Sequence, residues 1–281
     1  MTLALLVLLK ATVALIIFAI GMESTPGDAI RLLRNPGLLL RSLLAMYVLV
    51  PMAALALVTV LTLQPGVEIG LLVLAVSAGA PLLPRKLMGI GDGGYAFSLV
   101  VISSILAVVI VPAWIAVLGP YFGAPATLTP VIVAWVLAKS FFLPLIAGML
   151  VRWWFPALAT RFAARATAVA GVVLMLAALA LLGLNWEIVL HIKWEGVLTL
   201  AALIVLALAI GHLLGGPADD DRTALAIACA TRHIGVAVMV ATSLPGPRTI
   251  VILAVYITTS VVISLPYLRW RRVVAKRSPG P

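Results

Sequence analysis

The chain has 281 residues, of which 64% are hydrophobic and only 10% are charged. Soluble domains carry roughly 45 to 50% apolar and about 25% charged residues, so this composition excludes an ordinary soluble protein and indicates an all-α, polytopic membrane protein. The formal net charge of +10 would suggest a nucleic-acid partner in a soluble protein, but in a membrane protein it reports which side holds the basic residues, and no nucleic-acid partner is expected.

Nine apolar runs are long enough to cross a bilayer as helices, which takes about 20 residues each. The first run carries Lys10 in its middle and lacks a small-residue cleavage signal, so it predicts a retained span and not a signal peptide. Residues 26–35 predict a short amphipathic helix between the first two spans. No flexible linker interrupts the chain, so we interpret residues 1–281 as one domain. The runs fall near residues 2–22, 38–62, 67–84, 94–119, 129–151, 165–185, 195–215, 222–243 and 247–268.

Basic residues are concentrated in alternate connections between these spans. If successive connections are assigned to opposite sides, 14 of the 19 lysines and arginines fall on one side, two on the other and three within spans. The positive-inside rule then predicts a cytoplasmic C-terminus and an external N-terminus in the cytoplasmic (inner) membrane. Tryptophans near the span ends fit the aromatic belts at the membrane surfaces. They are Trp153, Trp154, Trp186, Trp194 and Trp270.

Two spans contain sequences that interrupt a helix. The third includes Gly79, Pro81 and Pro84, and the eighth includes Arg232 and Gly235. Because these spans lie five helices apart, they cross the membrane in opposite directions. Interrupted helices at corresponding places of two oppositely oriented halves predict an inverted repeat with a binding site at the midplane, as in secondary transporters. The alternative is that the breaks are proline kinks, as at Pro81 and Pro84, whose freed backbone groups are satisfied by neighbouring helices.

Arg232 and His233 stand side by side in the middle of the eighth span. An arginine at the bilayer centre costs at least about 2.5 to 3.5 kcal/mol, so its side chain should face protein or a water-filled cavity. Two interpretations remain for Arg232: it lines the cavity and attracts an anionic substrate, or it bonds helix-end carbonyl groups. His233 titrates near neutral pH and is either a proton-coupling group or a neutral polar residue of the lining. The three histidines show no metal-ligand spacing, and no cofactor is expected.

Several segments along the chain carry a resemblance to a known family. They are FAIGM at residues 18–22 followed by Pro26, Asp28 and Asn35, YVLVP at 47–51, KSFFLPLIAG at 139–148, and TALAI at 223–227 with GVA at 235–237. In type, order and spacing these segments resemble the bile acid:sodium symporter family. The resemblance implies the nine-helix form of that fold, with interleaved core and panel subdomains and two broken helices that cross at the substrate site.

The residues that hold sodium in that family are not kept at the positions that the resemblance assigns to them. Ala228 stands at the glutamate position, and Arg232 and His233 stand at the glutamine and asparagine positions. Because all nine acidic residues fall in loops or at span ends, no carboxylate is left at mid-membrane for a hard cation. We therefore expect no metal site. The other ligand positions carry Met46, Leu82 and Leu83, and Ser98 alone matches a hydroxyl ligand.

These observations predict a secondary active or facilitative transporter, and not an enzyme, which moves a small organic anion of the bile-acid or carboxylate type by alternating access. Transport is then either uniport or coupled to protons, and membrane lipid is the other expected partner. Two alternatives stay open: a non-transporting membrane receptor or subunit, and an arsenite-type exporter, although Cys229 lies outside the third span, where such an exporter would need it. The residues expected to line the substrate site are Ala80, Pro81, Ser98, Thr231, Arg232, His233 and Gly235.

Overall fold

A computed structural model describes residues 3–23, 27, 32–77, 93–122, 130–232, 237–238, 240–241 and 248–277. Over these residues the chain is helical and has no strand, as expected where lipid offers backbone groups no hydrogen-bond partner. The elements are α1 (Leu3–Glu23), η1 (Leu32–Arg34), α3 (Pro36–Leu44), η2 (Ala45–Leu49), α4 (Val50–Val60), α5 (Pro65–Val76), α7 (Gly93–Phe122), α8 (Pro130–Trp154), α9 (Pro156–Leu184), α10 (Trp186–Leu190), α11 (Trp194–Leu214), α12 (Asp219–Thr231) and α14 (Arg248–Arg277).

Four helical stretches among the described residues are long and apolar enough to cross a membrane. Two further apolar stretches, Pro65–Val76 and Ile105–Leu118, are shorter. These helices make the chain an integral membrane protein. The predicted nine spans and the inverted repeat also involve residues outside the described ranges, and both remain predictions. The four long stretches are Pro36–Val60, which comprises α3, η2 and α4, together with Pro156–Leu184, Trp194–Leu214 and Arg248–Val274.

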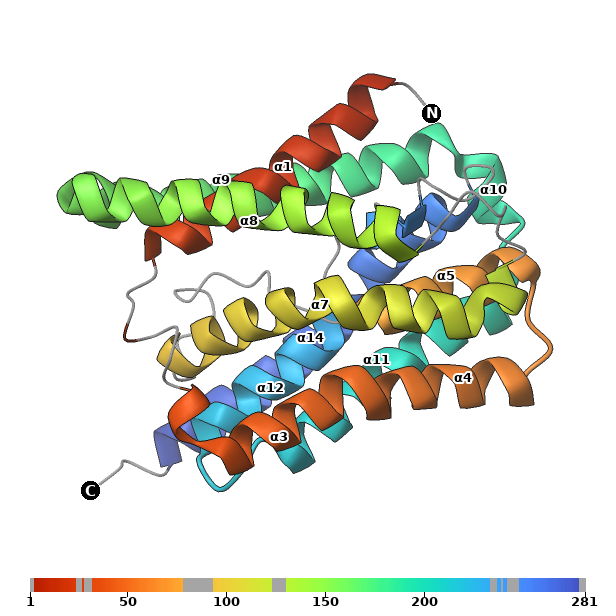
Figure 1. Cartoon of the computed structure of the whole chain (residues 1–281). Coiled ribbons are helices and arrows are strands. Elements are labelled where there is room, and N and C mark those ends of the chain that lie inside the picture. The colour runs from red at the N-terminus through yellow and green to blue at the C-terminus, as the bar shows by residue number, and fades with distance from the viewer. Residues whose placement is uncertain are drawn as a thin grey trace.

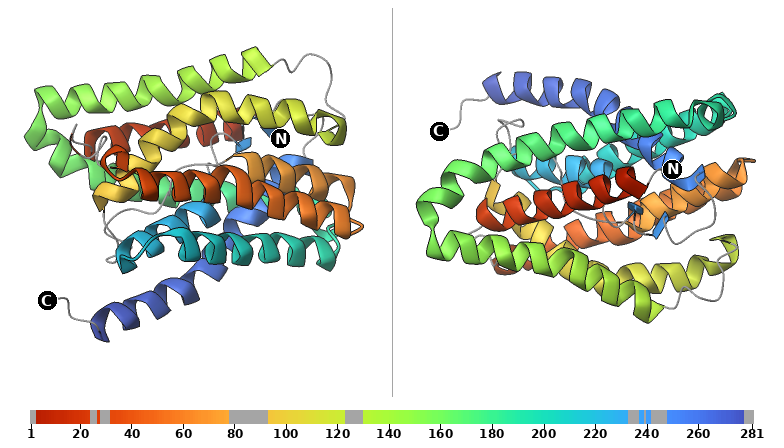
Figure 2. Two further views of the ribbon diagram at one scale, coloured as in Figure 1. Left: turned by 60° about the horizontal axis from the view of Figure 1, so that its bottom comes forward. Right: turned by 90° about the horizontal axis from the view of Figure 1, so that it is seen from above.

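The helices form two groups that lie side by side (Figure 1). In one group, α1 packs against both α8 and α9. In the other, α11 packs against α4, α12 and α14, while α5 packs against α4 and α14. The groups meet where α7 contacts α8 and where α14 contacts α9 (Figure 2). The largest apolar cluster is built mainly from the second group, and smaller clusters lie between α1 and α8 and between α1 and α9.

The two chain termini lie at opposite ends of the bundle (Figure 1). The end with the C-terminus also holds the α8–α9 and α11–α12 turns, whereas the end with the N-terminus holds the α4–α5 turn and α10. Arg161 near the start of α9, Arg222 near the start of α12 and Arg272 near the end of α14 therefore gather at one end, as the alternation of basic connections predicts. Which side of the membrane this end faces stays a prediction.

A hydrogen-bonded brace joins the start of α12 to the C-terminal part of α14. Arg271 is almost fully buried and donates to Thr223 Oγ1 at 2.9 Å, and it pairs with the Asp219 carboxylate at 2.8 Å. The hydrogen bond from Arg271 holds the pKa of Asp219 below its usual value. In the sequence, residues 219–221 are three aspartates just before the eighth span, where carboxylates favour a helix N-terminus through their charge and can cap it. In the structure they occupy the first turn of α12, and the N-cap residue is Ala218, which has no side-chain acceptor. The acids therefore act through their charge at the helix N-terminus.

Tryptophans lie at helix ends, as the aromatic-belt interpretation predicts. Trp154 ends α8 and Trp194 begins α11, and both side chains are exposed. Trp270 is exposed too but lies within α14, where its ring is 5.4 Å from that of His212 between centroids. Trp154 and Trp194 thus lie at helix ends and Trp270 packs against a neighbouring helix, while the position of all three relative to the membrane surfaces stays a prediction.

Residues 26–35, the predicted amphipathic helix, are described only in part. Residues 32–34 form a 3₁₀ turn, and the Asn35 side chain caps α3 by accepting a hydrogen bond from the Leu38 N–H at 3.4 Å. For these residues the prediction is corrected to a short turn that leads into α3. Apart from Gly27, the earlier part of the segment lies outside the described residues.

Candidate functional site

The break in the eighth predicted span occurs at Arg232, where α12 ends. Arg232 has φ 46° and ψ 164°, and it is the one non-glycine residue with positive φ in the described part of the chain. For a residue other than glycine, such a backbone conformation costs on the order of 1 to 3 kcal/mol, and it persists only when the surrounding structure holds the residue in place. The side chain of Arg232 is fully buried, so the surroundings in question are protein.

The Arg232 guanidinium is held by backbone carbonyl oxygens from two other elements. Its Nε donates to the Leu74 carbonyl at 3.0 Å, and its Nη2 donates to the Ala75 carbonyl. Both Nη atoms also lie 3.4 Å from the Met46 carbonyl oxygen. A planar group with donors on three nitrogens is suited to such a set of acceptors, because its geometry is fixed and it stays charged. We call the oxygens of Met46, Leu74 and Ala75 the carbonyl cluster.

These carbonyl groups lie where their helices are interrupted. α5 ends at Val76, and the carbonyls of its last turn carry the negative end of the helix dipole. The Leu74 carbonyl keeps one backbone hydrogen bond, from the Ser77 N–H at 3.2 Å, and its second lone pair accepts from Arg232. Met46 lies in η2, a π-helical turn, and the residue five positions further on is Pro51, which has no N–H to donate to the Met46 carbonyl. The neighbouring Tyr47 carbonyl likewise accepts a hydrogen bond from Trp114 Nε1 at 3.0 Å.

The end of α12 has its own side-chain partners. The Ala230 carbonyl accepts hydrogen bonds from the Tyr256 hydroxyl at 2.5 Å and from Ser260 Oγ at 3.4 Å, both on α14. Tyr256 is fully buried. The site is therefore a meeting point of three interrupted elements, η2, α5 and α12, whose freed carbonyls are taken by side-chain donors.

The charge of Arg232 is balanced by carbonyl dipoles. Among the described residues, no carboxylate lies within ion-pair distance of its guanidinium. Oxygen atoms that converge on a positive group are also what a hard cation seeks, by the same reasoning that applies to Ca²⁺ and Mg²⁺. The carbonyl cluster thus offers a positive group oxygen acceptors from two separate elements.

Comparison with known proteins identifies the family. The family model described as Sodium Bile acid symporter family matches residues 11–192. The chain belongs to this family. Proteins of this family are membrane transporters, so the chain is a membrane transporter by family. No curated protein gives a significant match. The matched residues run from α1 to the turn after α10, so they include the carbonyl cluster but not Arg232.

Only some of the predicted site residues of this symporter-family member lie in the part of the chain that the structure describes. Thr231 is half-buried, and its hydroxyl bonds the Ile227 carbonyl of its own helix at 2.8 Å. Ser98 is buried and accepts a hydrogen bond from the Leu32 N–H at 3.4 Å, and it is not a hydrogen-bond partner of Arg232. Ala228 is buried within α12. The predicted site residues His233, Gly235, Ala80 and Pro81, and the ligand positions Leu82 and Leu83, lie outside the described residues.

Most of the partners of Arg232 carry no signal in the sequence, because they are backbone carbonyls. In the sequence, Met46 stands out because its side chain cannot bind sodium. In the structure its backbone carbonyl oxygen accepts a hydrogen bond from Arg232. Leu74 and Ala75 contribute only carbonyls, which carry no residue signature, although the glycine and prolines that follow them predict a helix end. Tyr256 lies in an apolar span, and its pairing with the broken end of α12 had no signal in the sequence.

Proposed function

We propose that the protein carries a small organic anion across the membrane by alternating access and does not use the sodium sites of its family. The observation that supports this proposal is the Arg232 guanidinium, which is fully buried and bonded to the carbonyls of Met46, Leu74 and Ala75. A covalently tethered positive group then takes the structural place of the cotransported cation.

Electrostatics argue against a sodium ion beside this guanidinium. Two unit charges 4 Å apart repel by about 4 kcal/mol at an effective dielectric constant of about 20. The carbonyl oxygens that would ligate sodium are already hydrogen-bonded, and no described carboxylate offsets a second positive charge. The driving force we propose is therefore the substrate gradient alone or a proton gradient, with His233 as the sequence-based candidate for proton coupling.

The same charge favours an anion as the cargo. The guanidinium bonds are made with the protein itself, so in this conformation Arg232 acts on a substrate through its positive potential and not as a direct clamp. For the motion, we propose that α1, α8 and α9 form the panel and that the remaining helices form the core. These groups meet through few elements, α7 with α8 and α14 with α9. No observation favours a receptor subunit or an arsenite exporter, and Cys229 is buried within α12.

Uptake into proteoliposomes tests the proposal. Purified protein is reconstituted, and the uptake of labelled small carboxylates is compared in sodium, potassium and choline media of equal ionic strength. We expect transport at the same initial rate in all three media, because the cation position is occupied. Arg232→Lys, which keeps the charge but loses the planar fork, should reduce transport. A steep dependence of the wild-type rate on sodium would refute the proposal.

A further inference from the structure

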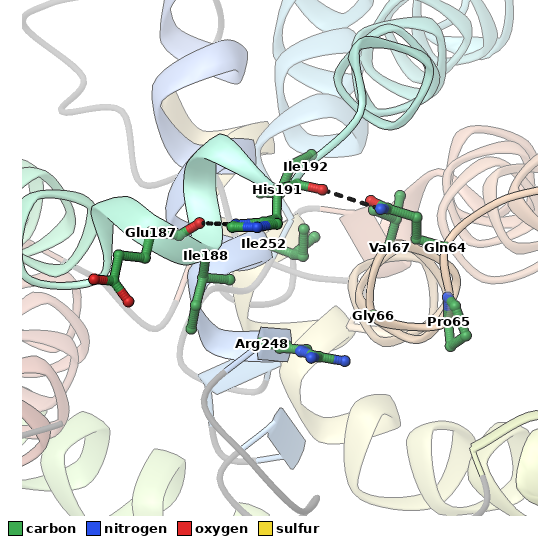
Figure 3. A pocket seen from close by; sticks show the side chains of 10 residues that line it. All are labelled: Gln64, Pro65, Gly66, Val67, Glu187, Ile188, His191, Ile192, Arg248 and Ile252. Carbon is green, nitrogen blue, oxygen red and sulfur yellow. Dashed lines mark hydrogen bonds between the residues drawn. The ribbon is translucent and has the colours of Figure 1, made fainter.

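A cavity of about 480 Å³ opens beside the α4–α5 turn and α10 (Figure 3), which lie at the end of the bundle that holds the N-terminus (Figure 1). It is lined by the start of α5, by α10 with the turn that follows it, and by the start of α14. Its volume falls within the roughly 300 to 1,000 Å³ typical of small-molecule sites. The cavity is separate from the Arg232 site, since Tyr256 lies about two helical turns further along α14 than Arg248, the first residue of that helix.

Arg248 gives this cavity a positive group without a partner. Arg248 is exposed, and within the described part of the chain it has neither a hydrogen bond nor an ion pair. Its aliphatic stem runs along Gly66, where a Cβ would stand 3.4 Å from Arg248 Cβ and 3.8 Å from Cδ. The first turn of α14 holds no acidic residue, so the positive helix end adds to the charge of the guanidinium. The group is therefore available to a ligand that carries a negative charge.

Other walls of the cavity are apolar. Val67 and Ile252 are each 2% exposed and line the cavity where α5 packs on α14. Ile188 of α10 is half-buried, and Figure 3 shows its side chain extending toward Arg248. A ligand that fills this space has an apolar body beside its charged group.

Hydrogen bonds fix the walls relative to one another. The Gln64 amide donates to the His191 carbonyl at 3.0 Å and accepts from the Lys193 N–H at 3.3 Å, which ties the start of α5 to the turn after α10. The cavity is thus preformed, which lowers the cost of binding. Figure 3 shows the Glu187 carboxylate turned away from Arg248. Arg248 is the one lysine or arginine in the lining, and Glu187 is its one carboxylate, so the lining offers a partner for a single negative charge.

We propose that this cavity binds a small amphipathic monocarboxylate, whose carboxylate pairs with Arg248 and whose apolar body lies against Ile188 and Ile252. The binding does not depend on the proposed function. Its use as the first docking place for the transported anion does rest on that function.

Calorimetry on the full-length protein in phosphatidylcholine nanodiscs tests this site, with 4-phenylbutyrate as the probe and its neutral amide as the uncharged match. The wild type should bind the carboxylate and prefer it to the amide by at least about tenfold, as expected for a charge-assisted bond. Arg248→Gln should weaken binding by a similar factor. Arg269→Gln removes the same charge from the exposed opposite end of α14 and should leave binding unchanged. Ile188→Trp should block the cavity and abolish binding.

Two results would overturn the proposal. One is equal affinity of wild type and Arg248→Gln for 4-phenylbutyrate, and the other is displacement of the probe by phosphatidylglycerol in the discs, which would assign the cavity to a lipid headgroup. Because binding is measured without a gradient, these results are independent of the uptake experiment. A protein that transports without sodium but fails to bind the probe here would contradict only the cavity proposal.

Discussion

Arg232 combines a strained backbone conformation with side-chain hydrogen bonds that offset the strain. Its backbone adopts a conformation that favours glycine, and its guanidinium bonds carbonyls of Leu74, Ala75 and Met46. The positive φ costs on the order of 1 to 3 kcal/mol, and several charge-assisted hydrogen bonds, each worth about 1.5 to 3 kcal/mol, offset that cost. A large residue is therefore tolerated at this break because its side chain forms hydrogen bonds with the carbonyl cluster.

Replacing the side chain should separate these two contributions. Arg232→Ala removes the guanidinium donors from the carbonyl cluster and should lower the free energy of unfolding by about 3 kcal/mol or more. Arg232→Gly loses the same bonds but relieves the backbone, so it should be more stable than Arg232→Ala by about 1 kcal/mol. Thermal unfolding in detergent measures both changes.

The matched control is Arg269→Ala, which removes an exposed arginine from α14. This variant should change the free energy of unfolding by no more than about 0.5 kcal/mol. Unfolding of Arg232→Ala at the wild-type temperature would mean that the guanidinium does not hold the break together.

At the scale of elements, side chains from other helices stabilise the interruptions. Trp114 of α7 bonds a carbonyl of η2, and Tyr256 and Ser260 of α14 bond the end of α12. η2 and α12 therefore take hydrogen bonds from intact neighbours, whereas the end of α5 takes them from Arg232 at the break of α12. Non-helical backbone at membrane depth is tolerated only where protein or a water-filled cavity surrounds it, and here protein does so.

The crossing of α1 and α8 depends on glycine for a different reason. A Cβ on Gly148 would collide with the Phe18 carbonyl oxygen, and one on Gly21 would collide with the Leu145 carbonyl oxygen. The two backbones are therefore in contact, as small residues allow between membrane helices. This contact fixes the geometry of the group formed by α1, α8 and α9.

Gly148→Ala should force α1 and α8 apart and lower the unfolding temperature, because the colliding atom is backbone and has nowhere to move. Gly171→Ala is the matched control on α9, since a Cβ there meets nothing within 4 Å. The control should be neutral or slightly stabilising, by up to about 1 kcal/mol, because alanine favours the helix. Equal unfolding temperatures for both variants would contradict the close contact.

At the scale of the whole molecule, the sequence predicts structural features that follow from the polarity and charge of side chains. It does not predict contacts that are made by backbone carbonyls. Apolar runs predict the helices, and the cost of a charge in such a run singles out Arg232 and the break beside it. The π-helical turn at Met46 and the pairing of its carbonyl with a residue 186 positions away have no sequence signature. Of the two interpretations of Arg232, bonding to helix-end carbonyls is the one visible in this conformation.

The central claim is that a tethered guanidinium takes the place of the cotransported cation, and a sodium titration of the purified protein tests it most directly. Thermal unfolding is followed while sodium replaces choline at constant ionic strength. A sodium site would stabilise the protein by about 2.7 kcal/mol at 100 times its Kd. We predict no saturable, sodium-specific rise in the unfolding temperature of the wild type, and such a rise would contradict the account.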